Sequence, residues 1–127
     1  MKETCFSDLV GLTIQDIKVD GAESITFVMS DGRVFSMHHN QDCCESVYIE
    51  DICGDMSDLI GSPITQAEEA SNSDDPPPAD GAAESYTWTF YKLATNRGGV
   101  TIRWFGTSNG YYSEYVDFSE MRQGGRR

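Results

Sequence analysis

Two histidines and two cysteines lie within seven positions of the sequence, in the segment HHNQDCC at residues 38–44. Imidazole and thiolate groups are preferred zinc ligands, and a tetrahedral site needs three or four of them within short reach. A site with four protein ligands is closed to water, so a full set would favour a structural zinc ion over a catalytic one. The expected ligands are His39, Cys43, Cys44 and Cys53, with His38 or Cys5 as a replacement for one of them.

Two other interpretations of this segment stay open. Free cysteine is among the most buried residue types, so Cys43 and Cys44 can be small core residues beside surface histidines. A cysteine nucleophile with a histidine base is the third interpretation. Asp42 or Glu45 would orient such a base, but the sequence offers no recognisable oxyanion-binding element.

Strand alternation selects the histidine that points inward. In RVFSMHH (33–39), His39 falls on the same face as Phe35 and Met37, whereas His38 falls on the opposite face. A disulfide between adjacent cysteines is strained, so we expect the cysteines to be thiols or metal ligands.

The elements that position these residues are mainly β-strands. Helix signals are limited to the short turns SDLVG and DMSDLIG, with Ser7, Ser57 or Asp55 as N-cap residues and Gly11 or Gly61 as the stop. The predicted fold class is mainly β, formally α+β with short helical turns. Alternating or β-branched segments predict strands at 13–19, 24–30, 33–39, 46–52, 85–94, 99–106 and 112–118.

The two short turns also indicate an internal duplication. SDLVGLTI (7–14) and SDLIGSPI (57–64) match at five of eight positions with an offset of 50. The segments 37–51 and 104–118 are similar at an offset of 67. The difference between the offsets is close to the length of the acidic, proline-rich segment 68–85, which we expect to be a flexible linker.

We therefore expect one domain over residues 1–127, with pseudo-repeat halves at 7–53 and 57–118. Neither half buries its apolar face alone, so the two similar meanders must pack as an antiparallel sandwich or a partly open barrel.

Charge limits the class of partner. The chain has 21 acidic and 9 basic residues, a net charge of −12. Nucleic acid is bound through Lys and Arg, so we expect no direct nucleic-acid binding and instead a basic protein, or a nucleic-acid-binding protein, as partner. No apolar run approaches a signal peptide or a membrane span, so a cytoplasmic protein without a membrane partner is expected. The expected partner-binding residues are Asp51, Asp55, Asp58, Glu68, Glu69, Arg103 and Trp104.

Basic and aromatic residues interleave in TFYKLATNRGGVTIRWFG (89–106). Such a sheet can stack a nucleotide signal, which makes a small-ligand binding protein the alternative function. More often these aromatics are the two faces of a sandwich, and acidic runs are often only solvated surface.

The sequence resembles a family of small phage and prophage proteins over residues 39–69 and 86–118. The resemblance rests on a His-x-x-Asp-Cys-Cys-Glu segment, an acidic EDI-x-GD stretch and a TIRW-x-G-x-SNGYYS segment. This family is similar to zinc-containing anti-CRISPR proteins, which block a Cas nuclease by binding it. The resemblance implies a phage-encoded inhibitor without enzymatic activity, acting on a Cas nuclease or another defence nuclease of the bacterial host. A zinc-dependent hydrolase is a further alternative. His39, Cys43 and Cys44 fall on the shared motif, whereas the role of Cys53 rests on its position alone.

Overall fold

The computed structural model describes residues 2–40, 44–72, 85–108 and 114–121. Within these ranges the chain forms β-strands and two four-residue 3₁₀ helices. No helix in the described part of the chain is long and apolar enough to cross a membrane. The elements are β1 (Lys2–Glu3), η1 (Phe6–Leu9), β2 (Ile14–Asp20), β3 (Ser24–Met29), β4 (Val34–His38), β5 (Ser46–Cys53), η2 (Met56–Leu59), β6 (Gln66–Asn72), β7 (Ser85–Thr95), β8 (Gly98–Ser108) and β9 (Asp117–Met121).

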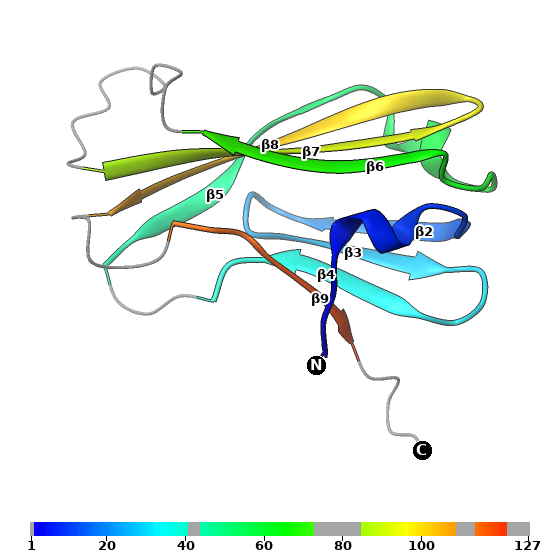
Figure 1. Ribbon diagram of the computed structural model, residues 1–127, viewed down its shortest axis with the longest axis horizontal. Coiled ribbons are helices and arrows are strands. Elements are labelled where there is room, and N and C mark those ends of the chain that lie inside the picture. The colour runs from blue at the N-terminus through cyan, green and yellow to red at the C-terminus, as the bar shows by residue number, and fades with distance from the viewer. Residues whose placement is uncertain (1, 41–43, 73–84, 109–113, 122–127) are drawn as a thin grey trace.

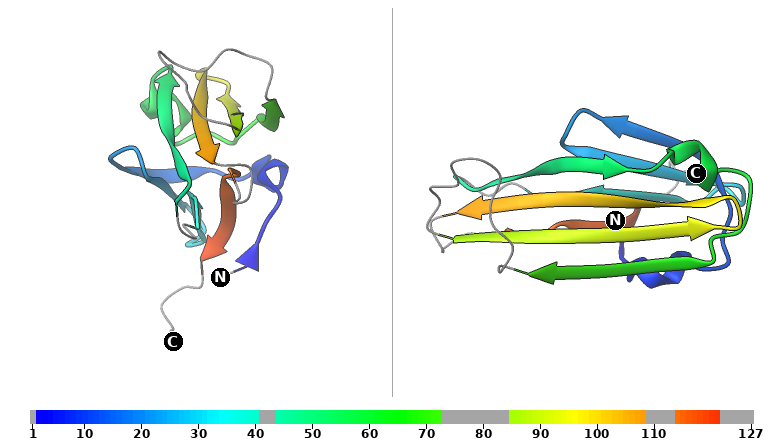
Figure 2. Two further views of the ribbon diagram at one scale, coloured as in Figure 1. Left: turned by 90° about the vertical axis from the view of Figure 1, so that its left-hand side faces the viewer. Right: turned by 90° about the horizontal axis from the view of Figure 1, so that it is seen from above.

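The strands form two antiparallel sheets that face each other as two layers (Figures 1 and 2). One sheet has the order β1-β9-β4-β3-β2, and the other has the order β5-β8-β7-β6. The sheets do not join into a closed barrel, so the mainly β class is confirmed and its architecture is an antiparallel sandwich.

The two halves exchange their last strand. Strands β2, β3 and β4 lie side by side in one sheet, and β6, β7 and β8 lie side by side in the other. The fourth strand of the first half, β5, pairs with β8, and the fourth strand of the second half, β9, pairs with β4. Each sheet is thus completed by a strand from the other half.

The connections between the halves follow the same two-fold pattern. The backbone N–H of Gly11 donates to the carbonyl of Ile64 at 2.8 Å, and that of Gly61 donates to the carbonyl of Ile14 at 3.0 Å. The two hydrogen bonds are equivalent, because the donors Gly11 and Gly61 are 50 positions apart and so are the acceptors Ile14 and Ile64. Gly11 and Gly61 both have positive φ, +94° and +91°, which glycine adopts without steric cost, so each ends its helical turn as expected.

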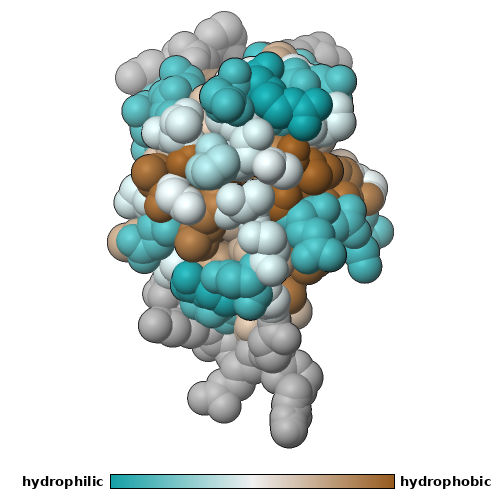
Figure 3. Space-filling model, turned by 90° about the vertical axis from the view of Figure 1, so that its right-hand side faces the viewer, coloured by the Kyte–Doolittle hydropathy of each residue, from teal (hydrophilic) through white to brown (hydrophobic). Residues whose placement is uncertain are grey.

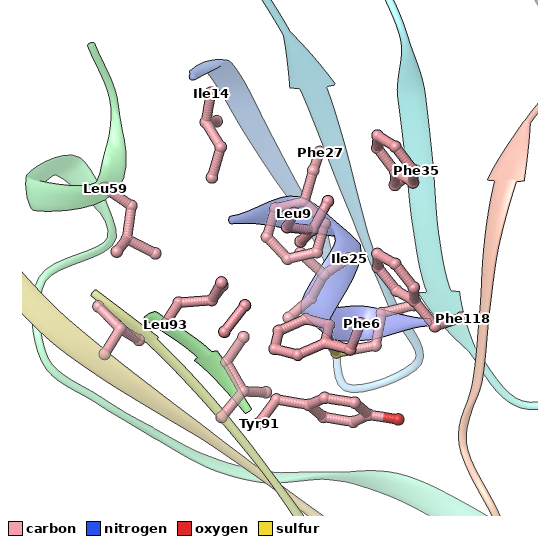
Figure 4. Packing of buried hydrophobic residues seen from close by; sticks show 14 of the residues in the cluster. Phe6, Leu9, Ile14, Ile25, Phe27, Phe35, Leu59, Tyr91, Leu93 and Phe118 are labelled. Carbon is pink, nitrogen blue, oxygen red and sulfur yellow. The ribbon is translucent and has the colours of Figure 1, made fainter. Parts of the chain in front are cut away.

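The core lies between the sheets and is rich in aromatic and aliphatic side chains (Figure 4). Phe6 contacts the rings of Tyr91 at 4.7 Å and Phe118 at 5.2 Å, so η1 joins the two layers. The Trp104 indole N–H donates to the sulfur of Met37 at 3.1 Å, linking β8 to β4. At the end of the sandwich seen in Figure 3, apolar residues form a band between hydrophilic ones, and Val10 is 49% exposed.

Two sequence predictions need correction. Residues 68–72 of the predicted linker are not linker but part of β6, because Ala67 is buried in the core and the segment pairs in continuous register with β7. Residues 73–84 lie outside the described part of the chain. The last strand begins at Asp117, where the chain joins the edge of β4, so residues 114–116 of the predicted strand 112–118 are not part of it, and residues 112 and 113 lie outside the described part of the chain.

Edge strands β2 and β5 share a protective feature. Each contains a register shift, between Ile14 and Asp16 in β2 and between Ile49 and Asp51 in β5. In each case the aspartate accepts a hydrogen bond of 2.9 Å from the next backbone N–H. A bulge whose aspartate accepts from the next backbone N–H occupies a donor that another strand would otherwise use, so it discourages edge-to-edge association.

Candidate functional site

His39 points inward, as predicted, and both of its ring nitrogens are engaged. Its Nε2 lies 2.7 Å from a carboxylate oxygen of Glu45, and its Nδ1 lies 2.7 Å from the carbonyl oxygen of Tyr115. The side chains of His39 and Glu45 are 4% and 0% exposed. The side chains of the first and last residues of the His-x-x-Asp-Cys-Cys-Glu motif therefore form a buried pair.

The partners of the His39 ring determine its protons. A carbonyl oxygen only accepts, so Nδ1 must carry a hydrogen and donate it to Tyr115. Nε2 then shares one further proton with the Glu45 carboxylate, as an ion pair or as a neutral hydrogen bond. Because both nitrogens are engaged in these hydrogen bonds, neither is free in this arrangement to bind a metal ion or to take a proton from a nucleophile.

The cysteines do not converge with His39 on one metal ion. Cys44 is disulfide-bonded in this structure, so its sulfur is not a thiolate, and the expectation that it is a thiol or ligand is not met. Cys5 and Cys53 are exposed free thiols. Cys53 lies at the far end of β5, roughly 25 Å along the strand from its start.

Cys53 is also a poor ligand in its own surroundings. Its thiol donates to the Asp51 carboxylate at 3.3 Å, and this hydrogen bond raises the pKa of the Cys53 thiol. The described residues contain no cluster of three or more potential ligands. His39, Cys44 and Cys53 thus do not fit one zinc ion in this arrangement, and Cys43 lies outside the described residues. Zinc in this segment remains a prediction.

A second carboxylate is buried at the same end of the sandwich. Glu114 accepts hydrogen bonds from Thr87 Oγ1 at 2.8 Å and from Ser108 Oγ at 2.5 Å. Its backbone oxygen would lie 2.5 Å from a Cβ at Gly106, so a glycine is needed where this segment crosses β8. Tyr115 is the next residue along the chain, so burial of Glu114 positions the Tyr115 carbonyl that accepts the hydrogen bond from His39. Sequence inspection missed Glu114, because nothing in its local pattern marks it as buried.

The predicted partner-binding set separates into different roles. Trp104 is 0% exposed in the core, so its assignment to a binding surface is wrong. The Arg103 guanidinium donates to Glu50 at 2.7 Å, lies 3.6 Å from Asp51 and stacks over Trp88 at 5.4 Å. Arg103 and Asp51 are therefore occupied within the chain.

Asp55 and Asp58 support the second helical turn. Asp55 caps η2 by accepting from the Ser57 backbone N–H at 3.0 Å and its hydroxyl at 2.7 Å, which lowers the pKa of the Asp55 carboxyl. The Asp58 carboxylate lies against Gly98, and its carbonyl accepts from Thr95 Oγ1 at 2.6 Å. Their charges remain near the surface, but their geometry already serves the fold.

Glu68 and Glu69 remain as exposed acids without a cationic partner among the described residues. Glu68 lies opposite Lys92 in the β6–β7 register, and no ion pair joins them in the described structure. Glu69 lies opposite Tyr91, towards the interior, and partial burial raises the pKa of the Glu69 carboxyl.

The basic and aromatic sheet divides between two faces. Tyr91 and Trp104 are buried in the core, whereas Trp88, Phe90 and Phe105 cluster on the outer face of the four-stranded sheet. Trp88 and Phe105 are only 5% and 3% exposed. These rings are packed against one another rather than open for stacking, which does not favour the nucleotide interpretation.

A pocket that sequence inspection missed lies between η1 and β6. It has a volume of ≈ 470 Å³ and is lined by Cys5, Phe6, Ser7, Ala67, Glu68 and Glu69. The lining segments are at least sixty positions apart, so only the tertiary structure brings them together.

A family model described as Domain of unknown function (DUF7448) matches residues 7–118, and the chain belongs to this family. The match begins and ends with the two pseudo-repeat halves. No curated protein and no solved structure matches the chain.

Proposed function

We propose that this DUF7448 protein is a binding protein that places an acidic surface on a basic, nucleic-acid-handling surface of a host defence nuclease. The proposal combines the resemblance to anti-CRISPR proteins with the charges of the described residues. It assigns the protein no catalytic step.

The observation that carries the proposal is the pair Glu68 and Glu69 on the outermost strand of one sheet. Both are exposed and lack a cationic partner among the described residues, whereas the other predicted acids support caps, bulges or hairpins. Exposed carboxylates that are not neutralised internally can replace phosphates in a groove that Lys and Arg line.

The arginines of the described chain reinforce this imbalance. Arg33 forms a two-contact pair with Glu120, at 3.1 and 3.0 Å, and Arg103 pairs with Glu50. Arg97 donates to the carbonyl of Ile60 at 3.2 Å. Because these cations are used within the chain, the surface presented to a partner is dominated by carboxylates.

The test is inhibition of a purified, guide-loaded Cas nuclease from a host of the phage family. We expect the protein to bind the nuclease and to block DNA binding, with affinity falling steeply as salt rises because the contact is electrostatic. Zinc content of the purified protein, by elemental analysis, tests the separate metal prediction. The proposal fails if a lysate pull-down at low salt recovers no nuclease and no other defence protein.

A further inference from the structure

Strand β6 has one unpaired edge. It pairs with β7 over all seven residues from Gln66 to Asn72, and no described strand pairs with its other side. The right-hand view of Figure 2 shows β6 as the outermost strand, with η1 beside its first half. An unpaired edge presents a row of backbone donors and acceptors that another extended chain can use.

The β6 edge differs from the other edges of the two sheets. β2 and β5 carry bulges in which Asp16 and Asp51 occupy a backbone donor, and β1 has only two residues. The register of β6 is continuous, without a bulge, and no proline interrupts it. Among the described strands, β6 is therefore the long edge that lacks these protections.

The pocket between η1 and β6 lies directly beside this edge. Phe6 and Ala67 provide an apolar wall, and Glu69 provides a carboxylate. Behind the wall, the buried Tyr91 contacts Phe6 at 4.7 Å and carries a hydroxyl without a hydrogen-bond partner. Figure 4 shows this hydroxyl pointing away from Leu93 and the labelled aliphatic side chains.

We propose that the β6 edge, together with the η1–β6 pocket, receives an extended basic segment of a partner protein as an added strand. This inference rests on the proposed function and names the surface that performs it. The partner backbone pairs with β6, and a Lys or Arg side chain enters the pocket, with its methylene stem on Phe6 and Ala67 and its charge at Glu69.

The register of β6 also sets the pattern of the partner segment. Glu68 and Glu69 are consecutive, so they face opposite sides of the sheet, Glu68 with Lys92 and Glu69 with Tyr91. Residues on an added strand alternate in the same way. The matching segment therefore has two adjacent basic residues within a run of β-branched residues.

A second copy of the chain does not fit this edge. Two β6 strands side by side would bring the carboxylates of Glu68 and Glu69 together, and each chain carries a net charge of −12. Like charges opposite each other destabilise strand pairing.

The probe is a synthetic eight-residue peptide with a central Lys-Arg step flanked by Thr and Val, titrated by calorimetry and by amide chemical shifts of the ¹⁵N-labelled protein. We expect saturable binding, with the largest shifts in residues 66–72. The same peptide N-methylated at alternate residues keeps its charge but cannot form the strand ladder, so it should not bind.

Charge-matched variants separate specific from general attraction. Glu69→Gln should weaken peptide binding by roughly tenfold, because it removes the carboxylate at the pocket. Asp20→Asn removes the same charge from an exposed position of β2 and should change affinity less than twofold. Circular dichroism confirms that both variants stay folded.

Several outcomes would overturn the inference: equal effects of the two substitutions, unchanged binding of the N-methylated peptide, shifts centred away from β6, or dimerisation through β6. Nuclease inhibition that survives Glu69→Gln would also overturn it, while leaving the proposed function intact. Peptide binding at β6 without any nuclease inhibition would contradict the proposed function and leave the strand-docking inference standing.

Discussion

Replacement of Glu45 is the sharpest test of how the motif segment is held. Its carboxylate lies 2.7 Å from His39 Nε2, with both side chains almost fully buried. Glu45→Ala leaves the imidazole without its counter-charge, and removal of one member of a buried pair costs about 3–5 kcal/mol. Glu45→Gln keeps the shape and one hydrogen bond, so we expect a loss of about 2 kcal/mol.

Those losses are large against the total stability of a domain of this size, about 5–15 kcal/mol. The same type of substitution at a partly solvent-exposed ion pair serves as the control for these losses of unfolding free energy. Glu50→Gln removes the partner of Arg103, whose side chain is 37% exposed, and should cost less than about 1 kcal/mol because solvent screens the pair.

The assay is urea unfolding followed by tryptophan fluorescence. Trp104 and Trp88 are both buried, so their emission reports loss of the core and of the outer face respectively. Coincident transitions from fluorescence and circular dichroism justify a two-state free energy of unfolding for each variant. The same titration with a chelator present distinguishes the ion pair from a metal ion.

Two results would refute the reasoning. Equal, small losses for Glu45→Gln and Glu50→Gln would mean that the His39 pair is not buried in solution. A wild-type protein that loses as much stability to a chelator as to Glu45→Ala would show that a metal ion, not the carboxylate, holds His39.

Three other substitutions test separate parts of the structure. Tyr91→Phe removes a buried hydroxyl without a hydrogen-bond partner and should raise the free energy of unfolding by about 1 kcal/mol. Burial also raises the Tyr91 pKa, so the unfolded chain alone ionises above about pH 10; wild-type stability should therefore fall from that pH upward, and urea titrations at pH 8 and 11 should show a smaller fall in the variant. Gly106→Ala places a Cβ 2.5 Å from the Glu114 carbonyl and should cost about 1–3 kcal/mol in thermal unfolding, whereas the less crowded Gly99→Ala should cost less. Asp16→Ala frees the edge donor of β2 and should produce concentration-dependent association in sedimentation; a strictly monomeric variant would contradict the protective role of the bulge.

Local signals predicted the secondary structure well because they act over a few residues. β-branched alternation located most strands, and Gly11 and Gly61 adopt the positive φ that the turn signal required. Alternation also placed His39 on the face of Phe35 and Met37; Phe35 and Met37 are buried, and the side chain of His39 is 4% exposed. Composition misled at Glu68–Asn72, where burial of Ala67 and pairing with β7 outweigh a linker-like sequence.

The site depended on contacts between distant segments. His39 acquires a partner from Tyr115, and Glu114 acquires hydroxyls from β7 and β8. Spacing alone grouped Cys53 with His39, because short sequence separation resembles proximity, but an extended strand carries them apart.

The amino-acid sequence by itself determined the mainly β class of the fold and the excess of negative charge, and it indicated two similar halves, since periodicity, turn residues and composition are local or additive properties. The tertiary structure alone decided that the halves exchange their fourth strands, that His39 is engaged by oxygen atoms, and that Glu68 and Glu69 are the acids of the predicted partner-binding set left without a partner among the described residues. Those outcomes depend on which strands become neighbours, and burial between two sheets settles that over the whole chain at once.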